Sequence, residues 1–455
     1  MKKIFLILLS AFVLDNSYCQ NTENSFFSLN QVAGYDSKIR AKSASEIVSV
    51  SFSSEDGNEI FTFIKDSNTM VCATVPYGYR INDFAVLDSC IFFCGKNVLN
   101  NCGYIAIFDV IIETLTIGGY EFRNIAETEE LTEIIAYKVS ENLPIYGSLA
   151  VARTKNQSYK TCVINLNNYY FDDYNYWKCG IGYECDNYLT DVALMWDGSS
   201  GEIVTVGQSL VVNSNQNNFI SSYLPKMYIR NYKKDAVFMS DMERVLNTYT
   251  DIRMSAISPF KITKLSGNNV VVSTVTKKNK LQNLNGVEIK RINLDNMEIN
   301  NIQFIDNTPG TLKEMTYLSN GNRLAILKEN TSEIDEIFIA NLSKLENYTT
   351  SKIYRNNTSF NSISNYDDTH FLATGVINNT ILSSLSVLQT NVNNFSTSEC
   401  INKENIQVSS EVKSIYPSSS PIDPVPAFNC TIAIELGFPV IYETTVGVKC
   451  LNYFK

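Results

Sequence analysis

One short pattern recurs along this chain and limits its fold more than any other feature. It consists of an apolar residue, a spacer, an acidic residue and a second apolar residue, which opens a β-rich run. Successive copies start 37, 50, 58, 60, 63 and 48 residues apart. The copies are Ala44–Ile47, Ile81–Phe84, Leu131–Ile134, Leu189–Val192, Tyr249–Ile252 and Leu312–Met315, and a seventh, Phe360–Ile363, has Ser362 in place of the acid.

Each repeat contains several short segments with strand character. In the clearest copy, strands are expected at Ile81–Leu87, Cys90–Cys94, Gly103–Val110 and Thr114–Ile117. Four short antiparallel strands in a repeat of this length are typical of a β-propeller blade. We therefore predict an all-β chain that forms a β-propeller of about seven four-stranded blades, with six and eight as the alternatives. The best helical candidate is the short stretch Ser240–Leu246.

The N-terminus has the pattern of a secretory signal. Two lysines precede the apolar run Ile4–Leu14, and the small residues Ser17 and Cys19 precede Gln20. We expect cleavage after Cys19 and a product that is secreted, periplasmic or at the cell surface. A lipoprotein acylated at Cys19 is the alternative, which the bulky Tyr18 disfavours. The apolar run is too short to span a hydrocarbon core of about 30 Å as a helix.

The C-terminal tail differs from the repeats. A segment with four prolines, Pro417–Pro426, is expected to be a loop or linker, and strand-like runs follow at Cys430–Leu436, Val440–Thr445 and Val446–Leu451. Because a ring of blades must close, we expect N- and C-terminal strands to close it, with a tail strand completing the short first repeat. The expected domains are a signal peptide (1–19), a lead-in segment (20–43), the propeller repeats (44–400) and the linker with ring-closing strands (401–455).

Charge and composition exclude some partners. The formal net charge is −10, and no cluster of Lys and Arg is present. Nucleic-acid binding requires concentrated basic charge, so nucleic acid is not an expected partner. No stretch after the signal is long and apolar enough for a membrane helix. The sequence says nothing about oligomeric state.

Ten cysteines remain after Cys19, and an even number in an exported chain favours disulfides. Cys94 and Cys102 flank a turn-rich segment and could face each other across a hairpin. A buried thiol at Cys94 that acts as a small apolar filler is an equal alternative. The others are Cys72, Cys90, Cys162, Cys179, Cys185, Cys400, Cys430 and Cys450.

Metal and nucleophile chemistry have few candidate residues. His370 is the only histidine, and no pair of cysteines has Cys-x-x-Cys spacing. A zinc site is therefore not expected, and His370 is interpreted as a residue at the start of a strand. The sequence predicts no metal and no cofactor, and it assigns no catalytic residue.

The chain resembles the secreted β-propeller proteins of gut Bacteroidetes, most of which have no assigned function. The resemblance is carried by the Met-Lys-Lys signal, the strand start Asn82-Asp83-Phe84, the hairpin segment Ile91–Gly95 and the following run Gly103–Asp109. It spans most of residues 44–400. What it implies is a propeller fold and an exported setting, and it transfers no catalytic residue.

The repeated acids have two interpretations. In the functional one, they form a carboxylate ring at the channel mouth that holds a cation or cationic ligand. In the structural one, each carboxylate accepts backbone N–H bonds in an adjoining turn or pairs with the neighbouring blade. Architecture needs the same acid in every blade, whereas catalysis needs only one or two, so we favour the structural interpretation. These acids are Glu46, Asp83, Glu133, Asp191, Asp251 and Glu314.

The best ligand-binding candidate is an acidic, aromatic segment between two strands. Aromatic rings pack on the apolar faces of sugars, while carboxylates accept bonds from sugar hydroxyls. The alternative is a disulfide-tied loop that covers a blade edge. The candidate binding residues are Asp172, Asp173, Tyr174, Tyr176, Trp177 and Tyr188.

The leading functional hypothesis is therefore an exported, non-catalytic propeller that binds a glycan or a protein through loops on one face. The alternative is a carbohydrate-active enzyme, a glycoside hydrolase or a lyase, that uses Asp or Glu residues at the central channel.

Overall fold

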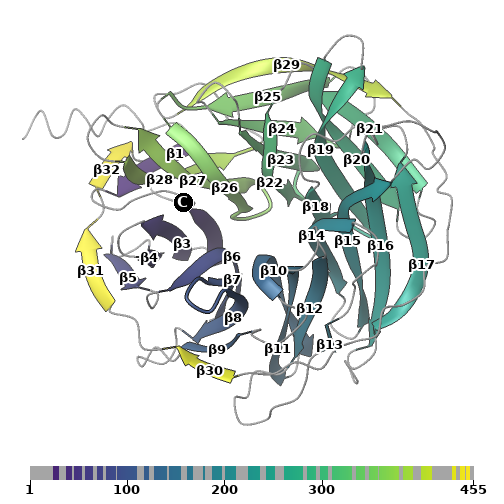
Figure 1. The fold of residues 1–455 in the computed structure, drawn as a ribbon. Helices are drawn as coiled ribbons and strands as arrows, with labels where there is room; N and C mark the ends of the chain where they lie inside the picture. The colour runs from purple at the N-terminus through teal and green to yellow at the C-terminus, as the bar shows by residue number, and fades with distance from the viewer. Residues whose placement is uncertain are drawn as a thin grey trace, which may run out of the picture.

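The chain folds into β-strands, as the computed structural model shows (Figure 1). The backbone forms strands that are numbered β1 to β32 in chain order. Side chains are described for residues 37–41, 47–50, 78–88, 90–106, 121, 129–138, 148, 150, 191, 193, 261–275, 286–293, 305, 310–329, 335–343, 350–356, 358–377, 388–392 and 401–406. No residue of the described chain is helical, so the predicted all-β class is confirmed. None of this part forms a helix that could cross a membrane.

The first 28 strands form seven antiparallel groups of four, which we name units 1 to 7. Unit 1 comprises β2 (Lys38–Ser43), β3 (Glu46–Ser53), β4 (Gly57–Ile64) and β5 (Thr69–Thr74). Unit 2 comprises β6 (Tyr79–Leu87), β7 (Cys90–Asn97), β8 (Cys102–Asp109) and β9 (Ile117–Glu121). Unit 3 comprises β10 (Thr128–Ser140), β11 (Leu143–Thr154), β12 (Thr161–Asn167) and β13 (Lys178–Cys179). Unit 4 comprises β14 (Asn187–Trp196), β15 (Ser200–Val211), β16 (Leu224–Asp235) and β17 (Met242–Asp251).

The remaining units follow the same order, except that the last one draws a strand from the N-terminus. Unit 5 comprises β18 (Lys261–Lys264), β19 (Asn269–Asn279), β20 (Leu284–Asn293) and β21 (Glu298–Ile305). Unit 6 comprises β22 (Thr311–Leu318), β23 (Arg323–Glu329), β24 (Glu336–Asn341) and β25 (Tyr348–Tyr354). Unit 7 comprises β26 (Thr358–Asn365), β27 (His370–Asn378), β28 (Ser383–Asn391) and β1 (Asn24–Leu29).

Two sequence predictions about these strands are wrong. The helical candidate Ser240–Leu246 overlaps β17, where pairing with β16 overrides a weak local preference. The segment 20–43, expected to be a lead-in, supplies β1 and β2. Unit 1 therefore has four strands before the C-terminal tail adds a fifth beside β5.

The C-terminal strands add a further layer at the outer edges of the units. β29 (Asn402–Glu411) pairs with both β21 and β25 and joins units 5 and 6 into one nine-stranded sheet. Beyond it, β30 (Ala433–Leu436) pairs with β9, β31 (Ile441–Thr445) with β5, and β32 (Gly447–Cys450) with β1. The tail thus contacts units 6, 5, 2, 1 and 7 in turn, and its strands lie at the periphery in Figure 1.

The first strands of the units contact one another in a closed cycle. β2 contacts β6, and the contacts continue through β10, β14, β18, β22 and β26 back to β2. Figure 1 shows the sheets disposed around this common centre. Because adjacent sheets cover both faces, burial is almost continuous along the described strands β7, β23 and β24 rather than alternating.

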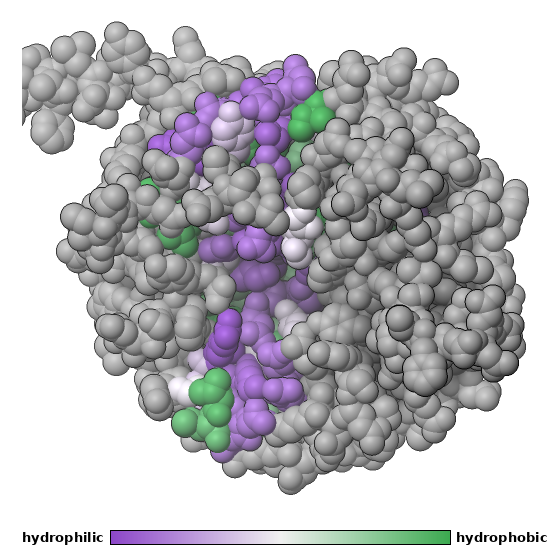
Figure 2. Space-filling view, turned by 45° about the horizontal axis from the view of Figure 1, so that its top comes forward, coloured by the Kyte–Doolittle hydropathy of each residue, from purple (hydrophilic) through white to green (hydrophobic). Residues whose placement is uncertain are grey.

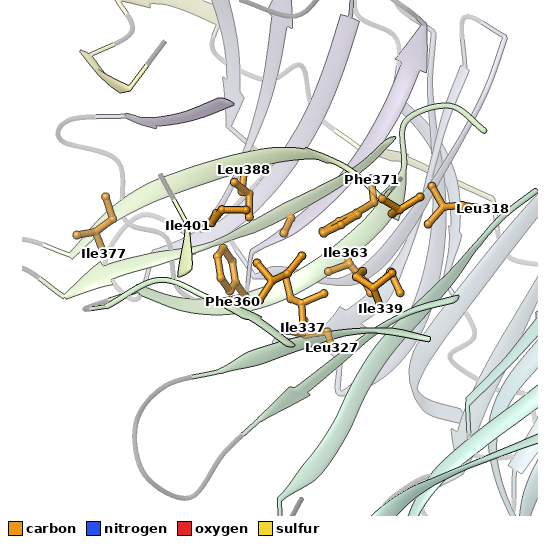
Figure 3. Close-up of a cluster of buried hydrophobic side chains, with 14 residues drawn as sticks. Leu318, Leu327, Ile337, Ile339, Phe360, Ile363, Phe371, Ile377, Leu388 and Ile401 are labelled. Atoms are coloured by element: carbon orange, nitrogen blue, oxygen red, sulfur yellow. The ribbon is translucent and has the colours of Figure 1, made fainter. Parts of the chain in front are cut away.

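The hydrophobic core lies between adjacent sheets. In β23, Ala325 and Leu327 pack toward unit 7, whereas Leu324 and Ile326 pack toward unit 5. This division follows from the two-residue period of a strand. Figure 3 shows the cluster between units 6 and 7, where Phe360 and Phe371 are fully buried against Ile337 and Ile339 of β24.

Cys94 and Cys102 do not form the disulfide that was one of the two alternatives for them. Cys94 lies opposite Ile105 and Cys102 lies opposite Asn97, so the hairpin register keeps them apart. Cys94 is a fully buried thiol, and burial raises its pKa well above the usual range. It therefore acts as the small apolar filler that was the alternative. Cys90 and Cys102 are also buried thiols, and the side chains of the other seven cysteines lie outside the described residues.

A bulge occurs at the same place in five of the first strands. In β6 the register shifts between Ile81 and Asp83, so the spacer Asn82 is the extra residue. The same shift occurs before Glu133, Asp191, Glu314 and Ser362. Gly95 lies opposite Ile81, and a Cβ there would be 1.8 Å from the carbonyl oxygen of Arg80. Glycine at this position permits the close approach of the two backbones.

Replacing Gly95 with alanine is expected to lower the free energy of unfolding by about 3 kcal/mol, because the added methyl group meets a backbone oxygen that cannot rotate away. Urea denaturation would measure the loss. Gly267→Ala is the control, since its Cβ would meet no atom closer than 3.5 Å and only the positive φ of 67° opposes it, at about 1 kcal/mol. Equal losses in the two variants would contradict the close-approach explanation.

Candidate functional site

One residue of each first strand occupies an equivalent place at the centre of the molecule. The backbone N–H of Ile134 donates to Asp83 Oδ2 at 3.0 Å, and that of Ile363 donates to Glu314 Oε2 at 2.8 Å. In each case the donor residue comes directly after the residue that occupies the equivalent place in the next unit: Ile134 follows Glu133, and Ile363 follows Ser362. The same link joins Ile262 to Asp191 and Ile39 to Ser362. We name the equivalent residues the ring residues: Lys38, Asp83, Glu133, Asp191, Lys261, Glu314 and Ser362.

Four of the six repeated acids belong to this ring, and two do not. Glu46 lies in β3, the second strand of unit 1, and Asp251 ends β17, the outermost strand of unit 4. The ring residues of units 1 and 5 are instead Lys38 and Lys261. A search for acids misses them, although each keeps the apolar residue that follows the ring position.

The spacer residues form a second link between adjacent units. The amide of Asn82 donates to the carbonyl oxygen of Leu131 at 2.7 Å, and Lys313 Nζ donates to that of Phe360 at 3.3 Å. Both acceptors are the apolar residues that open the next copy of the sequence pattern. The recurring pattern is therefore a joint between units, as the structural interpretation proposed.

Ion pairs connect the ring across its centre. Arg40, two residues after Lys38, places one guanidinium nitrogen 2.8 Å from Asp83 Oδ1 and 2.9 Å from Glu314 Oε1. Its other terminal nitrogen donates to Ser362 Oγ at 3.3 Å. Lys261 pairs with Glu133. The carboxylates thus bond to the neighbouring unit, as the structural interpretation expected, and they also lie around a common centre.

Burial and charge set the protonation of these groups. Burial raises the pKa of Asp83 to about 6 despite the nearby Arg40, and the Glu133 and Glu314 carboxylates add to the rise. Burial would also raise the pKa of Glu314, but Arg40 and Lys38 lower it to about 2. Lys261 and Lys38 likewise hold the pKa of Glu133 below its usual range against the effect of burial. The same carboxylates raise the pKa of Lys38 and Lys261, so both stay protonated.

A cavity of about 370 Å³ lies among the ring residues. Its lining contains the four ring carboxylates, Arg40 and Lys261, together with the residues two positions farther along the strands. The latter include Ile135, Ala193, Thr263, Thr316 and Ser364, which side-chain alternation places on the same face as the ring residues. Figure 2 shows the described residues on one face of the molecule as a largely hydrophilic band across its centre. The volume is within the usual range for ligand pockets, about 300–1,000 Å³.

The single histidine is not part of this cavity. His370 Nδ1 lies 2.8 Å from Asp367 Oδ2 and 2.8 Å from Thr369 Oγ1, within the turn between β26 and β27. Since both neighbours contact the same ring nitrogen, this cluster is not a nucleophile–base–acid relay. Among the described residues, no group of three His, Cys, Asp or Glu side chains could hold a metal ion.

The predicted binding segment does not belong to the described part of the chain. Asp172, Asp173, Tyr174, Tyr176 and Trp177 lie outside the described residues. Tyr188 belongs to β14, opposite Gln208, and its side chain is also outside them. The described cavity therefore rests on residues other than those predicted to bind ligand.

The comparisons with known proteins do not assign this site. No protein-family model matches the chain, and no curated protein matches it.

Proposed function

We propose that this chain is an exported, seven-bladed β-propeller that binds a ligand at its central cavity and catalyses no reaction. Seven four-stranded antiparallel units and the closed cycle of contacts among their first strands support the propeller. The signal-like N-terminus supports export. A glycan or a protein remains the expected ligand, and the segment around Trp177 remains a candidate for additional contacts.

The binding role is supported by the hydrogen bonds and ion pairs that already hold the cavity carboxylates. Asp83 and Glu314 each accept a backbone N–H from the next unit, and each also contacts Arg40. A general acid or base must exchange a proton with a substrate while keeping its position. Carboxylates held in this way serve the joints between units, while the remaining cavity surface offers polar groups to a ligand.

Filling the cavity tests this proposal. Thr316 lies on β22 and lines the cavity without belonging to the ion pairs, so Thr316→Trp is expected to weaken ligand binding at least tenfold and leave the fold intact. The measurement is a glycan-array screen of the purified protein, followed by titration calorimetry with each saccharide that binds. Thr311→Trp, the same change at an exposed position of β22, is the matched control and should bind as the wild type does. Unchanged binding by Thr316→Trp would locate the site elsewhere.

One observation favours the enzyme alternative. Asp83 has a pKa of about 6 and lies in a cavity with Glu133 and Glu314, and a carboxyl with a raised pKa is suited to act as a general acid. Release of reducing ends from any polysaccharide, abolished by Asp83→Asn, would establish this alternative. We expect no turnover with either protein.

A further inference from the structure

We propose that Arg323 binds the carboxylate of an acidic sugar, so that the ligand of the central cavity is a uronic acid or a glycan that carries one. This inference rests on the proposed function, because it names the chemical class of the ligand for that cavity.

Arg323 opens β23 at one end of the cavity, between units 6 and 7. It lies opposite Leu318 of β22, which belongs to the core cluster that packs against unit 7 (Figure 3). Thr316, two residues before Leu318, lines the cavity and lies opposite Ala325. Side-chain alternation places Thr316, Leu318 and Arg323 on the same face of the sheet. One strand spacing and two residues separate Thr316 from Arg323, so their Cα atoms are about 8 Å apart.

The guanidinium of Arg323 has no partner in the described part of the chain. Its Nε is buried and forms no hydrogen bond, while the residue as a whole is partly exposed, so an anion can reach the outer end of the group. Burial lowers the pKa of Arg323, and no carboxylate opposes this effect. The acids of the neighbouring turn bond elsewhere, Asp367 to His370 and Asp368 to Ser319. A buried, charged N–H without an acceptor is unfavourable, and pairing with an anion would relieve this cost.

The ring charges, in contrast, already have partners. The ring carboxylates bond to backbone N–H groups of the next unit and lie near three cations, Lys38, Arg40 and Lys261. Lys264 also lines the cavity, is exposed and forms no ion pair in the described structure. Lys264 and Arg323 are therefore two cations available to a ligand, one in the cavity wall and one at its end.

The groups around this end of the cavity favour a sugar as the source of the carboxylate. A guanidinium and a carboxylate can share two parallel hydrogen bonds, which orient the ligand as well as attract it. The adjoining cavity wall offers neutral polar groups, the hydroxyls of Thr263, Thr316 and Ser364 and the amide of Asn365. Such groups suit the hydroxyls of a sugar ring. A uronic acid presents both kinds of group in one small molecule.

Titration calorimetry with the wild-type protein at pH 7 and low salt tests the inference. The probes are sodium glucuronate and its uncharged counterparts glucuronamide and glucose, together with N-acetylglutamate and sodium sulfate as anions that are not sugars. We expect glucuronate to bind at least tenfold more tightly than each of the others. Its affinity should also fall several-fold as sodium chloride rises from about 0.01 M to about 1 M, whereas the affinity for glucose should not change.

Arg323→Met should lose at least tenfold in glucuronate affinity and leave the affinity for glucose unchanged. Arg323→Lys, which keeps the charge without the planar fork, should retain part of the affinity. Arg291→Met is the matched control and should bind glucuronate as the wild type does. Arg291 also has a buried Nε without a partner, but it lies in β20 of unit 5 and does not line the cavity.

Equal affinity for glucuronate and glucuronamide, with both blocked by Thr316→Trp, would overturn this inference and leave the proposed function standing. This comparison needs no variant of Arg323, so it holds even if such a variant fails to fold. Tighter binding of N-acetylglutamate or sulfate would overturn the assignment to a sugar, and glucuronate binding that survives Arg323→Met would overturn the assignment to Arg323. Failure of every probe and every array glycan to bind would overturn both the inference and the proposed function.

Discussion

Replacing Arg40 with methionine is expected to lower the free energy of unfolding at pH 7 by about 3–5 kcal/mol, the usual cost of removing one partner of a buried ion pair. The substitution leaves Asp83 and Glu314 buried without the guanidinium that contacts both. Urea denaturation would measure the change. Lys352→Met is the control, because Glu404 is exposed and Glu336 keeps its pair with Lys328, so this loss should cost under about 1 kcal/mol.

The pH dependence of this loss follows from the two carboxyl groups. In the wild type, the folded pKa of Asp83 is raised, so its contribution to stability decreases as the pH rises through about 6. The folded pKa of Glu314 is lowered, so its contribution is present above its ordinary pKa and is lost as the pH falls toward 2. Without Arg40 both pKa values rise. The deficit of Arg40→Met should therefore shrink between pH 7 and pH 5, and a constant deficit would contradict this account.

Ending the chain after Glu411 is expected to destabilise it by about 5 kcal/mol and to promote association. The truncation removes β30, β31 and β32, strands of four, five and four residues that pair with β9, β5 and β1. Each net hydrogen bond contributes about 1 kcal/mol, offset in part by the chain entropy regained. Unpaired edges of β5 and β9 would then accept strands from other molecules.

Three measurements check this result. Urea denaturation gives the stability, size-exclusion chromatography gives the association state, and hydrogen exchange should accelerate in β5, β9 and β1. A chain that ends after Leu451 is the control, because it retains all three strands. A monomeric truncated protein with an unchanged urea midpoint would show that β30, β31 and β32 do not stabilise the units that they pair with.

Several elements could be predicted because their signals are local. The strand-like runs of the tail correspond to β30–β32, and the first three strands expected in the second repeat correspond to β6, β7 and β8, whereas the fourth, expected at Thr114–Ile117, shares only Ile117 with β9. In the structure, Gly375 of β27 repeats the close approach of two backbones found at Gly95, since a Cβ at either position would lie within 2.0 Å of a carbonyl oxygen. Such features depend on residues that are near one another in the sequence.

Other elements escaped prediction because their signals are not local. Lys38 and Lys261 share a position with four acids, but a pattern defined by its acid cannot include a lysine. In unit 4, Asp251 matched the pattern by chance at the end of an outer strand. The strand β1 comes from a polar segment and pairs with β28, more than 300 residues away, whereas β2 pairs with the adjacent β3 but also bonds to Ser362 of unit 7.

The sequence by itself determines that this protein is a repetitive β-structure whose strands start at an apolar-spacer-polar-apolar joint, because alternation, turns and close glycines act over a few residues. Only the tertiary structure decides which side chains meet at the centre. That meeting requires β1 to pair with β28 and β2 to contact β26, which brings Ile39 to Ser362 and Arg40 to Glu314. Electrostatic neutralisation then depends on residues from different units, and no single repeat contains the site.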